Sequence, residues 1–599
     1  GGASSPTTGG PACFPGNILP ADRFDAVGRA LLNQFPEPNF TDRSVSLGQY
    51  NYRDQDIRDV TKRLNQLKLD FNATAKDRLT VRWRDWYPLT IGYGGTFGAG
   101  GNWNFHRQGY TKSEKSLQTT YTRTFGLNIV NEASASFRVM RETAPDSQDE
   151  RHLMSAVGIP PFQLFPDANV LGIVPAVSYP GVPTGTTITY DTRYPIAARD
   201  GRYSFVDNVS WSKGSHLFKA GLLYEFNPTS EGPQGTCFQG CFNFSSQTAV
   251  NINPLNTNYA FANALLGYYN QYQETNLKTE QKAQASIWEW FVQDTWKPIK
   301  NLTLDLGIRF GHVEPYRLPD DLIGAAFVPD RWNPARVPRL FRPAIVNGQR
   351  VGFDQITGQV VPSTLIGFLV PGSGDPNNGM VTDKGPLPPG GLTFMPSPPP
   401  AVTTSPRFGF AYDLGGAGRT AIRGSFSVLQ DLLPASSDLG RNVPGFAPYS
   451  RVSTFLYGRI PDLAGTAAYD SPINPVSFDE YEAQTAYTYS LEVQQNLGGA
   501  TTLSVAYVGN RYIDLRNNLN INPIPPGARF DPANADPTNP ATPLPDNFLR
   551  PMIGYGTINL RTKGGYSRYN SLQVTANRRV RSGLMFGSAY TFAVAKSTA

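Results

Sequence analysis

Strict alternation of apolar and polar residues recurs along the chain, and it predicts β-strands with one apolar and one polar face. In one segment the apolar positions are Leu302, Leu304, Leu306, Ile308 and Phe310, and the polar positions are Thr303, Asp305, Gly307 and Arg309. The same alternation runs through residues 78–84, 487–494, 502–507 and 584–592. Strands of this kind suit a sheet with lipid on one side and a polar lumen on the other.

Tight turns and long connections alternate between these segments. The short connections read as hairpin turns, and they are Ala75–Asp77, Phe125–Gly126, Lys213–Ser215, Pro298–Lys300, Gly415–Ala417, Gly498–Gly499 and Ser582–Gly583. The long connections are Pro88–Ser113, Thr143–Asp200, Asn227–Lys282, Pro315–Ser405, Asp431–Glu480 and Asp514–Gly565. None of the long connections shows an amphipathic period, so we expect them to be structureless. A compact soluble domain seldom contains even one such connection beyond about 15 residues.

The alternation of short and long connections predicts an all-β fold. The expected fold is an antiparallel transmembrane outer-membrane β-barrel, incomplete, with about fourteen strands. One partial barrel domain is expected over residues 1–599, with residues 1–59 as an extracellular loop and residues 60–599 as hairpins with long loops. The tight turns are expected at the periplasm and the long loops outside the cell. Aromatic residues near strand ends, such as Trp83, Trp86 and Tyr87, suit an interfacial girdle. The alternative is that these rings fill the core of a soluble β-sandwich.

Composition supports strands over helices. Aromatic residues make up 12% of the 599 residues and charged residues 17%, whereas soluble domains average about 25% charged residues. The net charge of +6 has no long basic run behind it, so no nucleic-acid partner is expected. No apolar run reaches the roughly 18 residues of a membrane-spanning helix.

Both ends of the sequence read as truncations. Gly1–Gly10 has neither an initiator Met nor a charged and apolar leader, and Ala599 directly follows a strand pattern. We therefore expect the natural protein to extend beyond these residues at both ends.

Cysteine and histidine placement argues against a metal or other cofactor. Cys237 and Cys241 form a Cys-Phe-Gln-Gly-Cys segment in a long loop, where a disulfide is favoured over a metal pair because no second Cys or His pair lies nearby. Cys13 is left over, either free or paired elsewhere. The histidines are scattered singly without zinc-ligand spacing, and they are His106, His152, His216 and His312.

Other candidate sites have weaker patterns. Gly92–Gly101 is glycine-rich but lacks the spacing and the following Lys of a phosphate cradle, so an external loop is expected. Oxygen ligands in Asp146–Glu150 and Asp531–Asn547 suit calcium at loop tips, although a solvated surface is favoured. No Ser, His and acid set can be assembled, so no enzyme is expected.

Four arginines are candidates for ligand contacts in the lumen. Arg82, Arg84, Arg309 and Arg423 alternate with apolar positions, and guanidinium groups suit anionic or carboxylate-bearing solutes. The favoured alternative is that they pair with Asp305, Glu492 or a plug surface, because lumen charges usually neutralise one another.

Several of these hairpins resemble the barrel of TonB-dependent outer-membrane receptors, specifically the Oar-like group that often carries a carboxypeptidase-regulatory-like domain. The similar stretches are Phe14–Asp25, Phe291–Lys297, Asn301–Arg309, Pro406–Asp413, Tyr569–Val574 and Gly583–Thr591. The resemblance implies a transporter closed by a plug and powered by TonB, but no TonB box, plug or regulatory-like domain is recognisable in this sequence.

The expected function is therefore binding and import of an unidentified solute through an outer-membrane barrel of a Gram-negative bacterium. The expected partners are outer-membrane lipid, the solute and the TonB complex acting through the missing plug segment. Two alternatives remain open. One is a passive or structural barrel that displays loops for adhesion, and the other is a secreted all-β carbohydrate-binding protein.

Overall fold

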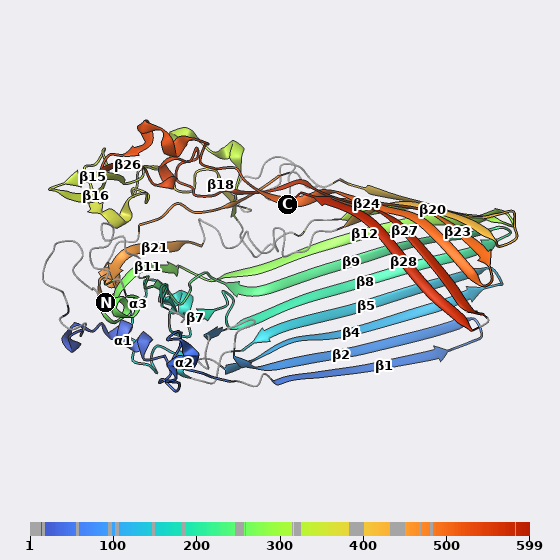
Figure 1. Cartoon of the computed structure of the whole chain (residues 1–599), viewed down its shortest axis with the longest axis horizontal. Coiled ribbons are helices and arrows are strands. Elements are labelled where there is room, and N and C mark those ends of the chain that lie inside the picture. Colours follow the sequence, from blue (N-terminus) through green and yellow to red (C-terminus); the bar gives the residue numbers. More distant parts are fainter. Residues whose placement is uncertain are drawn as a thin grey trace.

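A long curved sheet and a layer of folded connections make up the computed structural model of the chain (Figure 1). The structure describes residues 14, 18–55, 59–93, 99–101, 107–145, 150–182, 187–245, 257, 259–313, 316, 325–382, 400–431, 450–465, 469–479, 483–581 and 583–598. The tight turns gather at one end of the sheet, and the long connections gather at the other end (Figure 1).

The large sheet has 15 strands, and all but one of them form an antiparallel meander in which each strand pairs with the next in the chain. The meander consists of β1 (Asp59–Asn72), β2 (Asp77–Tyr93), β4 (Arg107–Phe125), β5 (Ile129–Ala144), β8 (Ile196–Lys213), β9 (His216–Gln234), β12 (Thr279–Ile299), β13 (Leu302–Val313), β19 (Thr403–Leu414), β20 (Thr420–Asp431), β23 (Gln484–Gly498), β24 (Thr501–Asn520), β27 (Asn559–Arg581) and β28 (Leu584–Ser597). The remaining strand, β22 (Val476–Phe478), runs parallel to β27. The fourteen predicted strands and their seven tight turns are thus confirmed.

The two edges of this sheet are β1 and β28, and within the described part of the chain they do not pair with each other. Several strands also extend beyond their predicted ends: β2 continues to Tyr93, and β9 continues to Gln234. The hydrogen-bonded pairing of the strands therefore continues into residues that were expected to be loop.

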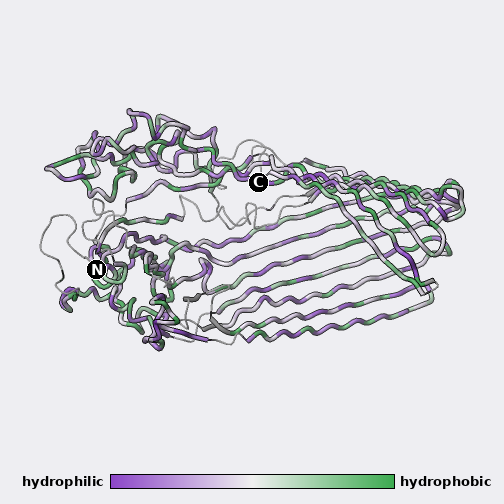
Figure 2. Tube along the Cα trace, in the orientation of Figure 1, coloured by the Kyte–Doolittle hydropathy of each residue, from purple (hydrophilic) through white to green (hydrophobic). Residues whose placement is uncertain are grey.

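The two faces of the meander differ in character, and residues opposite each other in an antiparallel ladder share a face. One face carries large apolar side chains that stay exposed, and they include Trp83, Leu117, Phe137, Phe205, Leu222, Trp290, Phe408, Phe426, Leu491, Leu572 and Phe592. Figure 2 shows the alternation of hydrophilic and hydrophobic positions along the strands. An apolar band of this extent belongs against lipid, as the alternation predicts.

The prediction of structureless long connections is wrong. Short strands from several of them form a second sheet in the order β21-β11-β10-β6-β7-β3. Its strands are β3 (Ala99–Gly101), β6 (Ala176–Ser178), β7 (Thr187–Tyr190), β10 (Cys241–Asn243), β11 (Tyr268–Thr275) and β21 (Val452–Arg459). The accompanying helices are α1 (Ala26–Leu32), α2 (Arg43–Ser46) and α3 (Ala260–Leu265). Residues 18–55, expected as a loop, supply α1 and α2.

The other connections also contain short elements. The small sheets are β14 (Ala325–Phe327) with β18 (Met380–Thr382), β15 (Arg342–Val346) with β16 (Gln349–Phe353) and β17 (Val360–Pro362), and β25 (Ala535–Asp536) with β26 (Asn539–Pro543). The 3-10 helices are η2 (Ala21–Arg23), η3 (Glu150–His152), η4 (Pro166–Asn169), η5 (Pro329–Arg331), η6 (Pro334–Arg336), η7 (Ser363–Leu365), η9 (Ile460–Gly465), η10 (Ala528–Phe530), η11 (Pro532–Asn534) and η12 (Asp546–Phe548). An ion pair of 2.7 Å between Arg350 and Asp536 joins two of these connections.

Helices in the described ranges are all too short or too polar to cross a membrane.

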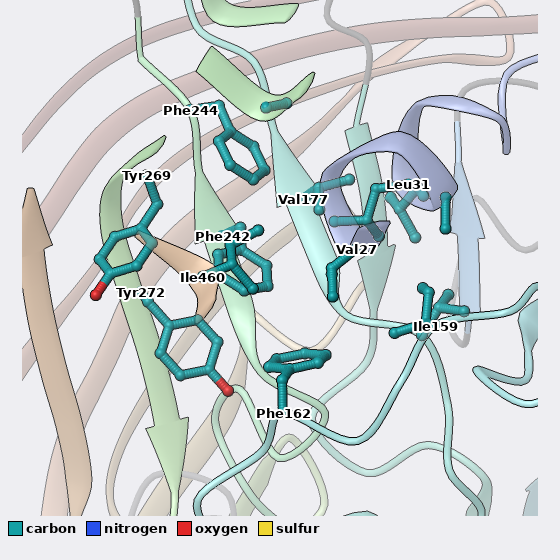
Figure 3. Close-up of a cluster of buried hydrophobic side chains, with 14 of the residues drawn as sticks. Val27, Leu31, Ile159, Phe162, Val177, Phe242, Phe244, Tyr269, Tyr272 and Ile460 are labelled. Carbon is teal, nitrogen blue, oxygen red and sulfur yellow. The ribbon is translucent and has the colours of Figure 1, made fainter. Parts of the chain in front are cut away.

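A hydrophobic cluster, here called the loop core, holds the second sheet, α1 and α3 together (Figure 3). Its members are Val27, Ala30, Leu31, Ile159, Phe162, Val174, Val177, Tyr179, Ile188, Phe242, Phe244, Ala260, Ala264, Tyr269, Tyr272, Phe455, Ile460 and Leu463. They come from the N-terminal segment and from three long connections. Burial of so many apolar side chains orders these connections as one layer, which we call the loop layer.

The N-terminal segment joins the loop layer through a close contact between α1 and α3. Asp25 begins α1 by accepting a hydrogen bond from the backbone N–H of Gly28, and its own N–H donates to the carbonyl of Leu265 at 2.8 Å. A Cβ added at Gly28 would lie 1.7 Å from the carbonyl oxygen of Ala264. Only glycine permits this approach.

Replacing Gly28 by alanine is therefore expected to separate α1 from α3. Overpacking of this kind costs about 1–3 kcal/mol, so amide exchange in residues 26–33 should quicken by about 5-fold to 150-fold. Gly564→Ala is the matched control, since no atom lies within 4 Å of its added Cβ. Equal exchange in both variants would contradict the helix contact.

Candidate functional site

The face of the meander opposite the apolar band is polar and carries paired groups. Hydroxyls of neighbouring strands contact each other at Ser425–Ser490, 2.8 Å, and Ser427–Thr488, 2.6 Å. Ion pairs on this face include Arg138–Glu114 at 2.6 Å and Arg202–Glu225 at 3.0 Å. A lumen surface of a barrel has this character.

All four candidate arginines lie on this polar face, and three of them have acidic partners. Arg84 lies 3.7 Å from Glu114, and Arg309 pairs with Glu289. Arg423 lies 3.6 Å from Glu492 and donates to Gln494 at 2.8 Å. The alternative of pairing with Glu492 thus applies to Arg423, whereas Asp305 accepts from Thr295 and not from Arg309.

Arg82 differs from the other three. It makes no side-chain hydrogen bond or ion pair with any residue that the structure describes, and in the ladder it lies between Lys68 of β1 and Gln118 of β4.

Further basic residues surround Arg82 on the polar face of β1 and β2. We call this group the cation strip, and it consists of Lys62, Lys68, Arg78, Arg82 and Arg84. Asp70 is the acidic residue on the same face of the two strands, and it binds Lys68 and Arg78 at 2.8 Å each. The strip keeps a positive excess, which favours anionic solutes. Lys62, Lys68 and Arg78 were missed as candidates. Arg78 alternates onto the same face of β2 as Arg82, and the pairing of Lys68 with Arg82 places Lys62 and Lys68 on that face of β1.

A buried ionic cluster joins the loop layer to the strands of the meander. Arg193, 6% exposed, lies 3.1 Å from Glu142, 3.0 Å from Asp191 and 2.9 Å from Glu231. Burial lowers the pKa of Arg193, but the ion pairs with Asp191, Glu142 and Glu231 outweigh it and raise the pKa overall. Arg193 therefore stays charged and ties β5 and β9 to the segment before β8.

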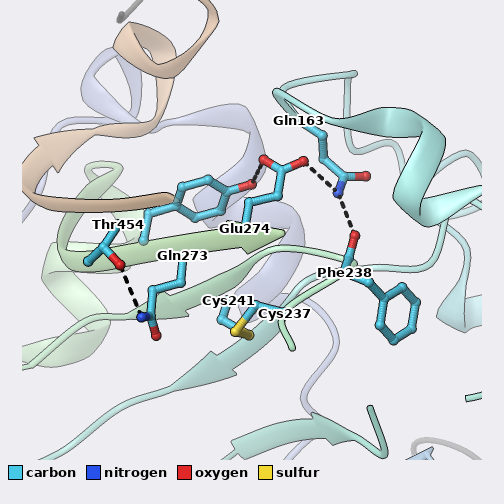
Figure 4. The surroundings of a disulfide bond; sticks show 8 residues. Gln163, Cys237, Phe238, Cys241, Gln273, Glu274 and Thr454 are labelled. Atoms are coloured by element: carbon cyan, nitrogen blue, oxygen red, sulfur yellow. Dashed lines mark hydrogen bonds between the residues drawn. A yellow bond between two sulfur atoms is a disulfide. The ribbon is translucent and has the colours of Figure 1, made fainter. Parts of the chain in front are cut away.

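Cys237 and Cys241 form a disulfide in the loop layer, with their Cα atoms 5.3 Å apart (Figure 4). Nearby, the fully buried carboxylate of Glu274 accepts hydrogen bonds from the backbone N–H groups of Leu164 and Phe165 and from the hydroxyl of Tyr272. Gln163 donates a further bond to it. Cys13 lies outside the described residues.

Lys278 lies beside this region at the start of β12. Its ammonium group donates to the carbonyl of Tyr194 at 2.7 Å and lies over the ring of Phe238. Burial lowers its pKa to about 8, since a charged amine is poorly solvated there.

The described histidines lie apart from one another, and each is buried or contacts another part of the protein. His152 is buried in the loop layer, His216 contacts Asp294 at 2.7 Å, and His312 contacts the carbonyl of Ala401 at 2.8 Å. His106 lies outside the described residues. Within the described ranges no three His, Cys, Asp or Glu side chains lie together as metal ligands.

The acidic stretch Asp531–Asn547 is folded and not fully solvated. Asp531 accepts from the N–H of Ala533, Asp536 is buried against Arg350, and Asp546 pairs with Arg529 at 2.8 Å. The interpretation as a solvated surface is therefore wrong for Asp536, and these carboxylates are engaged by the protein. Residues 146–149 lie outside the description, as do residues 94–98 of the glycine-rich stretch, whose end forms β3.

Comparison with solved structures finds similarity to outer-membrane transporters. The outer membrane transporter YddB from Escherichia coli matches at 8% identity and a TM-score of 0.45, over 90% of this chain and 48% of the transporter. The FrpB iron transporter from Neisseria meningitidis matches at 10% identity and a TM-score of 0.40, over 90% and 52%. The ferric yersiniabactin uptake receptor FyuA from Yersinia pestis matches at 8% identity and a TM-score of 0.38, over 90% and 52%.

The chain spans about half the length of these transporters. A search of curated protein sequences finds no match. A family model described as an outer membrane beta barrel domain matches residues 2–598. Together with the apolar band on the meander, this match places the protein in the outer membrane of a Gram-negative bacterium. The chain belongs to the outer membrane beta-barrel domain family.

Proposed function

We propose that this barrel belongs to a TonB-dependent transporter or receptor of the Oar-like group, which binds a solute at the loop layer and imports it through the lumen. The observation that carries the proposal is the position of the cation strip on the polar face of strands that lead away from the folded connections. In this proposal the tight turns face the periplasm, the loop layer faces the outside, and TonB acts through a plug segment.

The proposed solute is anionic or carries carboxylates. A guanidinium group without a protein partner binds a carboxylate through charge-assisted hydrogen bonds. Arg82 makes no side-chain hydrogen bond or ion pair within the described ranges, and Lys62 and Lys68 add positive charge on the neighbouring strand.

Replacement of Arg82 by glutamine is expected to weaken binding of a tricarboxylate probe, citrate, about 10-fold to 150-fold. This range corresponds to one hydrogen bond to a charged group, about 1.5–3 kcal/mol. Isothermal titration of the purified barrel measures the change. Arg423→Gln is the matched control, because Glu492 and Gln494 already engage Arg423. If the two variants bind citrate equally, Arg82 is not the anion-binding group.

Energy dependence is tested separately in cells. The full-length protein is expressed in an outer-membrane host with and without TonB, and uptake of its solute is followed over time. We expect uptake to require TonB. Uptake that continues at the same rate without TonB would contradict active transport.

A passive or structural barrel that displays its loops for adhesion is the second candidate. The loop core and the disulfide favour it, because a rigid, covalently braced surface suits recognition of another surface. Such a protein would bind its partner cell or matrix without energy-dependent uptake. The secreted carbohydrate-binding alternative is inconsistent with an outer-membrane barrel domain.

A further inference from the structure

Three basic residues lie side by side on the last three strands of the meander, at the end opposite the tight turns (Figure 1). Arg511 of β24 pairs with Arg568 of β27, and Arg568 pairs with Lys596 of β28. We call these three residues the rim row. Since neighbouring strands lie about 4.8 Å apart, the three Cα atoms span about 10 Å. All three side chains are exposed.

The ladder places the rim row on the face that carries the apolar band. Four residues nearer the tight turns, the same three strands contribute Tyr507, Leu572 and Phe592, which also pair with one another. These side chains are large, apolar and exposed. An even number of residues along a regular strand keeps side chains on one face, and no register shift separates the two rows. The cations therefore point to the lipid-facing side and away from the lumen.

No acidic residue neutralises the rim row within the described part of the chain. Its three side chains make no hydrogen bond or ion pair with any described residue. The residues two positions away from them along the strands carry no carboxylate, and these are Gly509, Ile513, Tyr566, Asn570, Val594 and Thr598. Like charges directly opposite each other destabilise a sheet. A bound anion removes this repulsion, so the row is suited to an anionic ligand.

Two tyrosines mark the level of the membrane interface beside the rim row. The rings of Tyr489 and Tyr507 stack with their centroids 6.1 Å apart. Both hydroxyls donate to the side-chain oxygen of Asn570, at 2.7 and 2.8 Å, and Asn570 lies two residues from Arg568 on the same face. A ring in the apolar band with its hydroxyl among polar groups is typical of the boundary between lipid tails and headgroups. The rim row therefore lies at the headgroup level.

The length of β27 agrees with this level. Arg578 lies on the same face near the tight turn, ten residues from Arg568, or about 33 Å at roughly 3.3 Å per residue. Barrel strands tilt by about 35–45°, so the two arginines differ in height by about 23–27 Å, against an apolar band about 25 Å tall. The residues between them on this face are uncharged, and they are Asn570, Leu572, Val574 and Ala576. Arg568 and Arg578 therefore mark the two borders of the band.

We propose that the rim row binds a phosphate group of one lipid A molecule, whose acyl chains lie against Leu572 and Phe592. The proposal rests on the orientation given under the proposed function, since tight turns at the periplasm put the row in the outer leaflet, where lipid A is the anionic lipid. The guanidinium groups of Arg511 and Arg568 donate paired hydrogen bonds to phosphate oxygens, and Lys596 adds a compact positive charge.

Native mass spectrometry of the full-length protein in detergent tests the site, with lipid A, dephosphorylated lipid A and phosphatidylglycerol added separately. We expect lipid A to bind at least about tenfold more tightly than dephosphorylated lipid A, and more tightly than phosphatidylglycerol. Arg568→Gln removes the central cation and should weaken lipid A about 10-fold to 150-fold, the range for one hydrogen bond to a charged group. Arg568→Lys keeps the charge and should recover part of this loss.

Arg578→Gln is the matched control, because it removes an arginine from the same face of the same strand at the opposite border of the apolar band. It should leave lipid A binding unchanged. Arg568 is exposed and makes no contact that the described fold depends on, so its variants should fold. Heat-modifiable gel mobility verifies the fold of each variant.

Three results would overturn the proposal. They are equal binding of lipid A with and without its phosphates, an equal loss in Arg568→Gln and Arg578→Gln, and tighter binding of phosphatidylglycerol than of lipid A. Tighter binding of phosphatidylglycerol with the same dependence on Arg568 would contradict the orientation as well. Uptake that does not need TonB would instead contradict active transport and leave lipid A binding unchanged.

Discussion

Replacing Arg193 by methionine is expected to destabilise the junction between the loop layer and the barrel by about 3–5 kcal/mol, the cost of leaving buried charges without their partner. Arg193 is the cation shared by Glu142, Asp191 and Glu231. Without it, these carboxylates repel one another in a poorly solvated position. The segment from β7 to β8 should detach first, because Arg193 and Asp191 both lie in it.

The effect is measured by amide exchange in residues 187–198 together with urea unfolding in detergent. Exchange should quicken by more than about 100-fold in this segment. Arg202→Met is the matched control, because its ion pair with Glu225 involves a mostly exposed arginine and such pairs contribute about 0–1 kcal/mol. A triple variant with Glu142→Gln and Glu231→Gln should recover part of the loss. If Arg193→Met and Arg202→Met behave alike, the cluster does not hold the junction.

The barrel strands were predictable from the sequence because the residues that identify each strand and each turn lie close together in the chain. A period of two over ten or more residues identifies a strand, and Gly214 or Gly583 at positive φ marks the turn between two such strands. Pairing with the next strand in the chain needs no long-range information. The order of the meander then follows directly.

The loop layer was not predictable in the same way. Its strands are three to eight residues long, too short for a reliable period, and their partners lie far away in the sequence. For example, Tyr272 of β11 pairs with Phe455 of β21. Burial of such residues depends on packing between different connections, which a single sequence does not reveal.

The candidate site was likewise only partly predictable from the sequence. Alternation placed Arg82, Arg84, Arg309 and Arg423 on the polar face, and the structure agrees with that placement. Which arginine lacks a partner depends on diagonal neighbours across strands. Arg309 pairs with Glu289 because the turn at residues 300–301 sets their register. Glu142, Asp191 and Glu231 meet at Arg193 only through tertiary structure.

Replacing Glu274 by alanine is expected to release the segment around residues 163–165 from β11 and to cost the loop layer about 3–5 kcal/mol. Each hydrogen bond to a charged group contributes about 1.5–3 kcal/mol, and each buried group left without a partner costs about 1–3 kcal/mol. The N–H groups of Leu164 and Phe165 and the hydroxyl of Tyr272 would all lose their acceptor. Gln163 would lose a contact as well (Figure 4).

Gln273→Ala is the matched control for this change, since Gln273 is the neighbouring residue of β11 and its side chain donates a neutral hydrogen bond to Thr454 at 3.1 Å. Exchange of the amides of Leu164 and Phe165 should quicken by more than about 100-fold in Glu274→Ala and by less than about 10-fold in Gln273→Ala. The barrel strands lie outside this network, so heat-modifiable gel mobility should persist in both variants. Unchanged exchange at Leu164 and Phe165 would show that the loop core alone orders this segment. The buried carboxylate would then be dispensable, and the disulfide and the apolar packing would hold the loop layer without it.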